Sequence, residues 1–452
     1  MIHQIHGILW GPVMLFVMLA VGGAYTVRSG FFQITKLRIW LGATVGNVWK
    51  NETQKETSSD RHSVTRWQSA CTALAATVGT GNIVGVATAL TAGGPGAIFW
   101  MWVSSGIGMM TAYAETSLGI RYRYRDEKGR WICGPMVYLE RGMQLPKTGI
   151  LYGVFCILAS FGMGSMVQSN AIADTVQYAA GLSPTITGAI LLILVLIVIR
   201  GGISRIAVVS EKLIPLSAGV YVFFSLIVLG SYYDRIPAIL AEIVHCAFTP
   251  EAALGGVGGY GISKSLRYGV ARGVFSNEAG LGSLAVLHGA TEDTTPEEQG
   301  MWAMFEVFFD TIVICTLTAL VILCGAGTSG YDGAALTAYA FEARLGSLGQ
   351  YLVSAAMLLF AFATIIAWYY LAKQTLAYLL EKLGQVWPGS KRLHHVLEVL
   401  YLTGYLSAVF LGCVASLELV WEISDIWNGL MAVPNMIALI CLMGLFTLPK
   451  TY

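Results

Sequence analysis

Long apolar runs alternate with short polar segments along most of this chain. A run of about 20 apolar residues forms a helix that crosses the roughly 30 Å hydrocarbon layer of a membrane. The pattern therefore predicts an all-α polytopic membrane protein with about 11 transmembrane helices. The expected spans cover residues 8–27, 69–92, 96–120, 151–180, 185–200, 206–230, 262–290, 300–326, 350–380, 396–417 and 427–447.

Two other segments, 31–50 and 236–249, mix apolar and polar positions and are expected to lie along the membrane surface as amphipathic pieces. The first span has no Lys or Arg before it, unlike a secretory signal peptide, and a basic stretch follows it. We therefore expect this span to be retained in the membrane.

The basic residues predict the orientation of the chain. If the N-terminus lies outside, 22 of the 27 Lys and Arg residues fall in cytoplasmic segments, and only Arg235 and Arg344 fall in external ones. Such an excess follows the positive-inside rule. The other three, Lys264, Arg267 and Arg272, flank or enter the seventh span. We expect a multi-pass protein of the plasma membrane (the inner membrane in a Gram-negative cell), with its N-terminus outside and its C-terminus in the cytoplasm.

Composition agrees with this class and excludes others. Hydrophobic residues make up 56% of the chain and charged residues only 12%, whereas soluble domains average about 25% charged residues. No basic tract interleaved with aromatic residues predicts a nucleic-acid partner. The eight cysteines contain no C-x-x-C pair, so neither disulfides nor a structural metal site is expected.

One apolar span is interrupted in a way that a continuous helix would not require. Residues 71–102 carry Gly79, Gly81 and Gly85 around Thr80 and Asn82. At membrane depth, backbone leaves the helical hydrogen-bonding pattern only where protein or a water-filled cavity receives the freed groups. A binding site is one interpretation. The other is close helix packing, because Gly81 and Gly85 form a G-x-x-x-G spacing.

A second interrupted span favours the binding site. When the first span is set aside, ten remain as five plus five, and the opening span of the second five contains Phe275 to Gly282 with its own glycines. Broken spans at matching positions indicate inverted repeats around a midplane transport site. The expected divisions are an N-terminal extra helix with a cytoplasmic amphipathic segment (1–68), a first repeat (69–230), an external interfacial linker (231–261) and a second repeat (262–452).

Several motifs resemble one family. The stretches VGTGNIVGVATAL, GGPGAIFWMW, MVQSN, RGVFSNEAGLGS and ATIIAWYY are similar to those of the alanine or glycine:cation symporters. The resemblance runs from about Trp67 to the last span. It implies a leucine-transporter-type fold of five plus five inverted helices with one extra N-terminal helix. It also implies sodium-coupled, sometimes proton-coupled, uptake of a small neutral amino acid, with no cofactor besides the co-transported ion.

The chain departs from the family pattern at one place. Where the family often continues WYYYGE, this chain has Leu371, Ala372 and Lys373 after the two tyrosines. The departure lies near the cytoplasmic end of its span. It bears on gating or regulation more than on substrate binding.

The first break suits the carboxylate of an amino acid. The helix that resumes near Thr80 or Gly81 points free amides and a positive dipole end at the cavity, and this needs no Arg or Lys. Gly81 allows the backbone to approach the ligand closely. Thr80 and Asn82 add hydroxyl and amide groups, although Asn82 has the alternative role of capping the resumed helix.

The second break suits the ammonium group. Carbonyls near Phe275 and Ser276 are left without helical partners and can accept from it, and Asn277 is a further candidate contact. Glu278 is ionisable at membrane depth and is therefore a candidate functional residue. Its alternatives are a pair with Arg272 or a cap on the second half-helix.

Polar or aromatic residues elsewhere complete the candidate substrate site. The resemblance implies that Gln168 contacts the ligand, while Gln168 and Asn170 are equally suited to interhelical hydrogen bonds. Trp368 is expected to close the pocket over the substrate side chain, with ordinary aromatic packing as the alternative.

A sodium site follows from the fold analogy. Backbone carbonyls from Ala76 to Gly79 and the hydroxyl of Thr364 supply the oxygen ligands that such an ion needs. Asp310 is a candidate proton or sodium site, because it lies inside a span. Glu115 is also inside a span, and we expect it to pair with Arg121 or Arg123.

Two other functions fit the sequence less well. An embedded enzyme needs gathered nucleophiles, bases or metal ligands, and only His245 and His288 lie near spans without belonging to any motif. A channel favours a continuous polar pore, whereas broken helices with small residues suit an occluded site. The substrate spectrum, the coupling ion and the oligomeric state are left open by the sequence.

Overall fold

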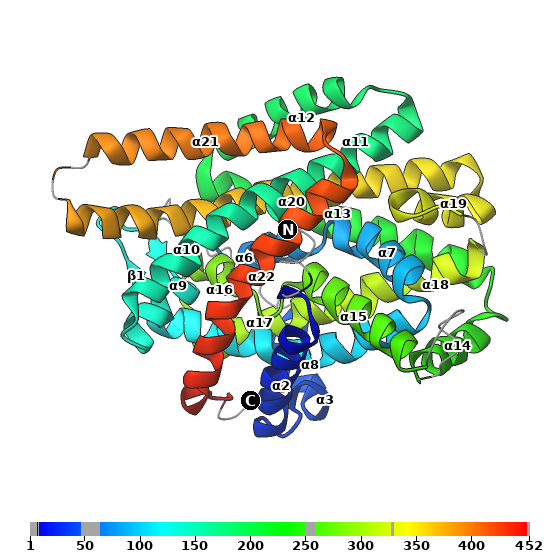
Figure 1. The fold of residues 1–452 in the computed structure, drawn as a ribbon, viewed down its shortest axis with the longest axis horizontal. Coiled ribbons are helices and arrows are strands. Elements are labelled where there is room, and N and C mark those ends of the chain that lie inside the picture. The colour runs from blue at the N-terminus through cyan, green and yellow to red at the C-terminus, as the bar shows by residue number, and fades with distance from the viewer. Residues whose placement is uncertain are drawn as a thin grey trace.

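The protein is described here by a computed structural model that covers residues 7, 9–46, 64–248, 258–326, 330–387, 389 and 391–449. Helices account for nearly all of it (Figure 1). The expected interfacial segment 31–50 and linker 231–261 lie partly outside the described residues. Within them, short helices α3 (Phe32–Thr35) and α4 (Leu37–Ala43) and helix α14 (Ile236–Phe248) are present.

The first half of the chain contains six of the expected spans as helical segments. In chain order they are α2 (Pro12–Arg28), α6 (Arg66–Thr77) with η1 (Thr80–Asn82) and α7 (Val84–Gly93), α8 (Gly96–Tyr122), α10 (Pro146–Phe161) with η3 (Gly162–Met166) and α11 (Val167–Ala180), α12 (Pro184–Ile199), and α13 (Gly202–Gly230).

The second half contains the other five. They are α15 (Gly258–Asn277) with α16 (Ser283–Leu287) and η5 (His288–Ala290), α17 (Pro296–Val307) with η6 (Phe308–Cys315) and α18 (Thr316–Gly325), α20 (Ser347–Val386), α21 (Lys391–Val414), and α22 (Leu417–Cys441) with η7 (Met443–Leu445). The expected all-α membrane fold with two interrupted spans is thus confirmed.

Length and composition alone identify only part of this set as membrane-crossing. Six helices in the described ranges are long and apolar enough to cross a membrane, and α2, α7, α12 and α14 are shorter apolar helices. The difference has three causes: the spans of 69–92 and 262–290 are broken into shorter pieces, α2 and α12 have only 17 and 16 residues, and α8 is long but less apolar.

Three features were not expected from the sequence. Helix α19 (Gly333–Leu345) lies between α18 and α20. A small antiparallel hairpin pairs β1 (Tyr124–Arg125) with β2 (Trp131–Ile132), and it is followed by α9 (Pro135–Val137) and the π-helical η2 (Tyr138–Gly142). All of these fall in segments too short or too polar to show an apolar period.

Glycines allow the interior helices to approach closely. A Cβ built on Gly269 of α15 would lie 2.3 Å from the Ala97 carbonyl of α8, and one on Gly412 of α21 would lie 2.6 Å from the Met166 carbonyl. Small residues favour association of membrane helices because their backbones can touch. Figure 1 shows α8 running beneath α15 and α17, and α12 lying along α21.

Candidate functional site

The first break is closed by its own asparagine. Helix α6 starts with a capping box between Thr65 and Gln68, and it ends at Val78, whose backbone is extended. After it, Asn82 Oδ1 accepts from the Gly79 amide at 2.9 Å. Asn82 therefore acts as the cap that the sequence offered as its alternative role. All of Thr80, Gly81 and Asn82 are buried.

The second break is built on left-handed backbone. Glu278 has φ +58°, Gly280 +95° and Gly282 +80°. A non-glycine residue in this region is strained and persists where the surroundings hold it. Asn277 supports the turn, since its Oδ1 accepts from the Ala279 amide at 3.0 Å and its Nδ2 donates to Thr311 Oγ1 at 3.0 Å.

Two π-helical stretches lie beside the breaks. Segment η3 interrupts the span of 151–180 at Gly162–Met166, and η6 interrupts the span of 300–326 at Phe308–Cys315. Such stretches occur often at functional sites because they redirect side chains and loosen the backbone pattern. They bring Met163 and Asp310 to the centre. Asp310 is visible in the sequence as a carboxylate inside a span, whereas no residue pattern predicts the π-helical geometry itself.

The two breaks touch each other through Gly81. A Cβ built on Gly81 would lie 2.8 Å from Ser276 Cα and 2.9 Å from Ser276 Cβ. A Cβ on Gly79 would lie 2.6 Å from Thr364 Oγ1 and 3.1 Å from Gln168 Oε1. Both glycines are thus required by close approach. The Gly81–Gly85 spacing does not itself form a helix contact, because no heavy atom lies within 4 Å of a Cβ on Gly85.

Gln168 reaches the first break with its side-chain carbonyl. Its Oε1 accepts from the Thr80 amide at 3.2 Å, and its Nε2 donates to the Met163 carbonyl at 3.1 Å. The Thr80 hydroxyl oxygen is buried and has no hydrogen-bond partner among the described residues. A buried hydroxyl without a partner is costly unless a ligand or water satisfies it.

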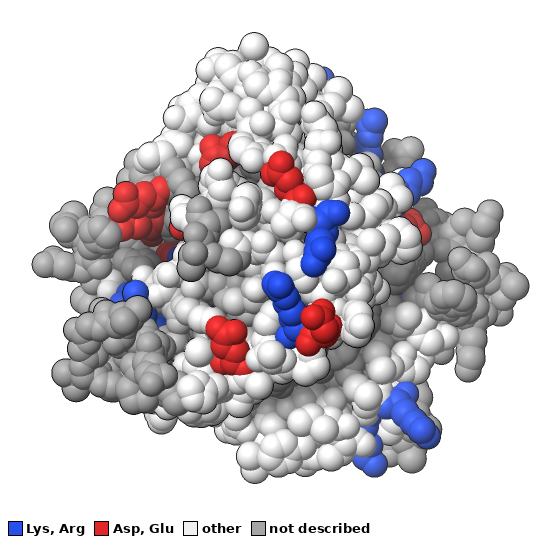
Figure 2. Space-filling view, turned by 90° about the vertical axis from the view of Figure 1, so that its right-hand side faces the viewer, with Lys and Arg blue, Asp and Glu red and all other residues white. Residues whose placement is uncertain are grey.

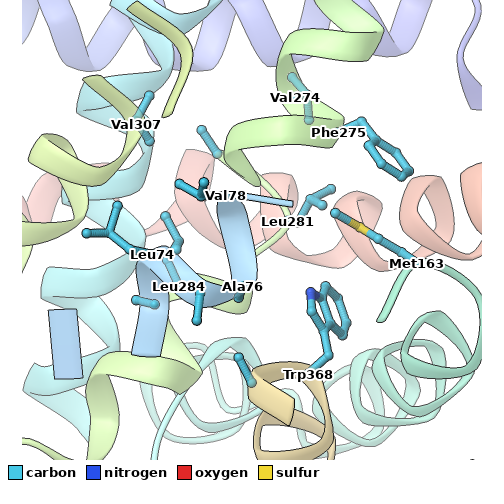
Figure 3. Close-up of a cluster of buried hydrophobic side chains, with 14 of the residues drawn as sticks. Leu74, Ala76, Val78, Met163, Val274, Phe275, Leu281, Leu284, Val307 and Trp368 are labelled. Atoms are coloured by element: carbon cyan, nitrogen blue, oxygen red, sulfur yellow. The ribbon is translucent and has the colours of Figure 1, made fainter. Parts of the chain in front are cut away.

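Trp368 lies against the second break. Its ring is fully buried, and its Nε1 donates to Glu278 Oε1 at 2.8 Å. A Cβ on Gly164 would lie 2.7 Å from Trp368 Cβ, so η3 packs directly on the ring. In the view of Figure 3, Trp368 lies opposite Phe275, with Met163 and Leu281 drawn between them. These four side chains surround the region between the breaks.

The pairing of Glu278 with Arg272 was a wrong alternative. Arg272 instead forms an ion pair with Asp425 of α22 at 3.3 Å and stacks over Trp421 at 4.5 Å. Phe275 contacts the same Trp421, with ring centroids 4.6 Å apart. Arg272 lies on α15 more than one turn before Glu278, which follows the end of that helix. Arg272 therefore faces α22 instead of Glu278.

Asp310 gathers three neutral donors around one buried carboxylate. It accepts from Asn82 Nδ2 at 2.6 Å, from Ser276 Oγ at 2.8 Å and from Thr311 Oγ1 at 2.9 Å. The donors come from the first break, the second break and η6. None of them is a cation. A buried carboxylate held only by neutral donors retains strong attraction for a proton or a metal cation.

Thr364 forms a second polar contact on the other side of the first break. Its Oγ1 donates to the Ala75 carbonyl at 2.8 Å and to its own helix at Phe360 O, 3.1 Å away. Ala76 is buried on the same short helix. The expected sodium residues Ala76, Gly79 and Thr364 therefore lie close together, with Ala75 as the carbonyl that Thr364 contacts.

Two other buried polar residues, Asn170 and Glu115, form hydrogen bonds between helices and do not contact Asp310 or Thr364. Asn170 Nδ2 donates to the carbonyls of Gly412 and Ala415, which fastens α11 to α21. Glu115 Oε2 accepts from Asn435 Nδ2 at 2.9 Å, and the same amide group donates to the Gly280 carbonyl at 2.9 Å.

The expected pairing of Glu115 with a neighbouring arginine is therefore wrong. Arg121 donates to the Leu445 carbonyl, and Arg123 donates to the carbonyls of Gly289 and Thr291. Both arginines follow Glu115 by more than one turn, so Arg121 faces the C-terminal segment and Arg123 faces the chain at the end of η5.

A buried histidine network was also missed. His288 Nδ1 lies 2.6 Å from Gln299 Oε1, and its Nε2 lies 3.1 Å from Glu306 Oε2. These residues join the end of the second break to α17. Their spacing along the chain forms no motif, so only their polarity inside apolar spans could have signalled them.

One cavity lies beside the start of α7. It measures about 380 Å³ and is lined by Val84, Asp174, Tyr178, Asp332 and neighbouring residues of α19. Figure 2 shows the face of the molecule on which α14 and α19 lie, where acidic and basic side chains are scattered singly. The cavity lies near the first break, because Val84 is separated from η1 only by Ile83 in the chain.

Comparison with known proteins identifies relatives over nearly the whole chain. The family model described as the sodium:alanine symporter family matches residues 1–450. The sodium/alanine symporter AgcS of Methanococcus maripaludis is 38% identical over 453 residues, covering 98% of this chain and 94% of that protein. An uncharacterized transporter of Haemophilus influenzae is 40% identical and covers 97% of this chain and 92% of its own length.

Other relatives carry different substrate names. A probable sodium/glutamine symporter of Bacillus subtilis, GlnT, is 34% identical and covers 98% of this chain and 88% of its own length. Among solved structures, MhsT in complex with L-phenylalanine superposes with a TM-score of 0.57 at 15% identity, covering 87% of this chain and 94% of that one. This likeness shows the leucine-transporter-type fold.

Proposed function

Because the chain belongs to the sodium:alanine symporter family and is a secondary amino acid transporter, we propose that it imports a small neutral amino acid, alanine or glycine, together with sodium. The members of this family are transporters rather than enzymes. Transport proceeds by alternating access, in which one helical repeat moves against the other around a fixed central site.

The unpartnered Thr80 hydroxyl is the observation that carries the carboxylate site. It lies beside the Thr80 amide, which is occupied by the carbonyl oxygen of Gln168. A substrate carboxylate oxygen can replace that carbonyl oxygen on the amide and accept from the hydroxyl as well. Gly81 leaves the backbone uncovered for this approach, and Asn82 keeps the break in shape.

The second break receives the ammonium group and the side chain. Carbonyls at the end of α15, near Phe275 and Ser276, accept from the ammonium, because the last carbonyls of a helix lack partners within it. Trp368 forms the wall over the substrate side chain. The tight contact of Gly164 with Trp368 favours alanine and glycine over larger substrates such as the glutamine named for one relative.

Sodium binds beside the first break in this proposal. Carbonyls from Ala76 to Gly79, at the end of α6 and just after it, form one oxygen set with the hydroxyl of Thr364. Asp310, with Asn82 and Ser276, forms a second set that carries a negative charge and neighbours both breaks. Proton coupling is the alternative, and the buried Asp310 carboxylate is what favours it.

The orientation completes the proposal. The hairpin and α9 belong to the face rich in Lys and Arg, which we assign to the cytoplasm, while α14 and α19 lie on the external face. The N-terminus then lies outside and the C-terminus in the cytoplasm of a plasma-membrane protein.

Uptake by purified protein in liposomes tests the function. Radiolabelled alanine and glycine are expected to accumulate above the external concentration under an inward sodium gradient, in a saturable manner, and not under a potassium gradient. Saturation and accumulation distinguish a transporter from a channel.

Competition by other amino acids tests the pocket. Arginine, glutamate and tryptophan are expected to leave alanine uptake unchanged, since the close packing of Gly164 on Trp368 leaves room only for a small substrate side chain. Displacement by any of them as effective as that by glycine contradicts the small neutral pocket. Uptake driven equally by a proton gradient without sodium contradicts sodium coupling and directs attention to Asp310 or Glu278.

A further inference from the structure

A second cavity lies on the side of the hairpin and reaches Tyr369 and Tyr370, which follow Trp368 on α20. It measures about 630 Å³ and is formed where the turn between α12 and α13, the hairpin and residues 369–374 of α20 meet. Its lining residues are Lys128, Arg130, Arg200, Gly201, Gly202, Ile203, Ser204, Ile206, Tyr369, Tyr370, Lys373 and Gln374. No part of the proposed transport site lines it.

Cations dominate this cavity. Lys128 and Arg130 come from the hairpin, Arg200 from the α12–α13 turn and Lys373 from α20. Two carboxylates lie near its edge: Asp126 pairs with Arg130 at 2.6 Å, and Glu398 of α21 lies within electrostatic range of Lys373. With four cations against these two carboxylates, the cavity retains a positive charge.

A helix start adds to this charge. Helix α13, 29 residues long, begins at Gly202 with Gly201 as its N-cap, and no side chain caps it. Gly201 to Ser204 line the cavity. The first amides of a helix and its dipole form a favourable environment for an anion. Gly202 leaves this helix start open, because no heavy atom lies within 4 Å of a Cβ built on it.

An amide group inside the cavity is incompletely bonded. Gln374 is only 8% exposed; its Nε2 lies 3.0 Å from the Tyr370 hydroxyl, and its Oε1 has no partner among the described residues. The two ends of the amide are interchangeable by a flip, and Tyr370 can donate to the oxygen instead. The flipped amide then presents its NH₂ group to a bound anion.

From these three features we propose that the cavity binds a phosphate-bearing anion. Arg and Lys side chains, helix-start amides and a side-chain amide are all donors, which suits the several acceptor oxygens of a phosphate. The volume exceeds that of a single ion and accepts the group attached to the phosphate. The phosphate comes either from an anionic phospholipid headgroup at the membrane surface or from a soluble compound.

The proposal gives a role to the departure from the family motif. Lys373 is the last residue of the Leu371–Ala372–Lys373 segment, at the position where the family pattern often has glutamate. A glutamate there would face Arg130 and Lys128 as a counter-ion, whereas Lys373 adds a cation to them. The lysine is thus suited to recruit an anion from outside the chain.

Binding is measured on the purified full-length protein, without transport, so the outcome is independent of the proposed function. Inorganic phosphate is titrated in detergent at constant ionic strength while thermal unfolding is followed. In parallel, phosphatidylglycerol retained from mixed nanodiscs is counted by native mass spectrometry. Stabilisation by phosphate indicates a soluble source, and retention of phosphatidylglycerol without it indicates a lipid headgroup.

Charge variants identify the site. Lys373→Glu and, separately, Arg200→Gln are expected to weaken whichever binding is found about tenfold or more. Lys147→Glu makes the same charge change as Lys373→Glu on an exposed residue outside the cavity and is expected to leave binding unchanged. Should Lys373→Glu fail to fold, Arg200→Gln provides the test. The proposal is overturned if the wild type binds neither probe, or if Lys147→Glu weakens binding as much as the cavity variants do.

Discussion

At the scale of single residues, Gly81 has no room for even one methyl group. Its Cβ would lie 2.8 Å from the Ser276 backbone of the opposite break. We expect Gly81→Ala to lower alanine affinity at least about tenfold, because the breaks must separate by several tenths of an ångström. Gly81→Leu is expected to abolish alanine binding while membrane insertion stays normal. Isothermal titration with alanine measures the affinity of both variants.

Gly85 provides the matched control. It is a buried glycine on the adjoining α7, and a Cβ there meets no heavy atom within 4 Å. Gly85→Ala is expected to keep alanine affinity within about twofold, since its methyl group enters open space. If Gly81→Leu transports alanine at the wild-type rate, Gly81 is a packing residue and the carboxylate site is misplaced.

The Thr364 hydroxyl can be removed with little change of shape. Thr364→Val deletes one candidate sodium ligand, so it is expected to weaken sodium affinity before it changes alanine affinity at saturating sodium. Thr375→Val on the same helix removes a buried hydroxyl whose partners among the described residues are Cys156 and the Leu371 carbonyl of its own helix. It is expected to leave sodium affinity unchanged. Sodium titrations of alanine uptake compare the two. Equal effects of both variants contradict this sodium set.

The residue types in the sequence predicted where the candidate site lies, but they did not predict which hydrogen bonds its polar groups form. The glycines around Thr80 and the polar run at Ser276 are visible because apolar spans otherwise exclude such residues. Which partner each polar group chooses depends on helix rotation and on residues far away in the chain. Asn170, for example, bonds to carbonyls of α21, and Glu115 bonds to Asn435 instead of to a nearby arginine.

At the scale of elements, the second break depends on Glu278. Its left-handed backbone costs about 1–3 kcal/mol, and its side chain holds the Trp368 ring. Glu278→Gln keeps the acceptor oxygen, so alanine affinity is expected to stay within about threefold of wild type. Glu278→Ala removes the acceptor and releases the ring, and affinity is expected to fall at least about tenfold.

Titration calorimetry with alanine measures both Glu278 variants. The two variants distinguish a role of Glu278 as the hydrogen-bond acceptor that positions Trp368 from a role as a proton carrier. If Glu278→Gln loses sodium-driven uptake as completely as Glu278→Ala does, the charge of Glu278 matters more than its hydrogen bond. The interpretation that Glu278 acts by positioning Trp368 is then wrong.

Elements were predictable where composition changes and hidden where it does not. Glycines mark both broken helices inside apolar runs, and the structure interrupts the backbone at those points. The π-helical turns η3 and η6 carry Gly162, Gly164 and Asp310 inside apolar runs, but such residues do not distinguish a π-helical turn from continuous α-helix. Helix α19 and the hairpin fall in connections, where a short element has no long pattern to show.

At the scale of the whole molecule, the breaks of the two halves meet at one centre. Gly81 of the first half touches Ser276 of the second, and Asp310 bonds to side chains from both breaks. A change at this centre is therefore felt by both halves at once. That arrangement suits coupling, because an ion and a substrate bound there stabilise the same closed contact.

The proposed sodium coupling leads to a prediction about charge movement. One sodium ion carried with one neutral zwitterion moves one positive charge inward. A potential of 100 mV contributes about 2.3 kcal/mol per charge, and a tenfold sodium gradient contributes about 1.4 kcal/mol. Together they support accumulation of alanine up to roughly 500-fold.

Alanine-evoked current in proteoliposomes, recorded while external sodium is varied, measures the coupling directly. We expect an inward current that rises with sodium and saturates, and alanine accumulation that stays below the limit for one coupled ion. Asp310→Asn keeps the side-chain shape but removes the buried charge, so it is expected to reduce the sodium dependence of the current. A current independent of sodium, or one driven equally by a proton gradient in its absence, contradicts sodium coupling. Asp310 is then the first residue to examine as the proton carrier, because its carboxylate is held by neutral donors alone.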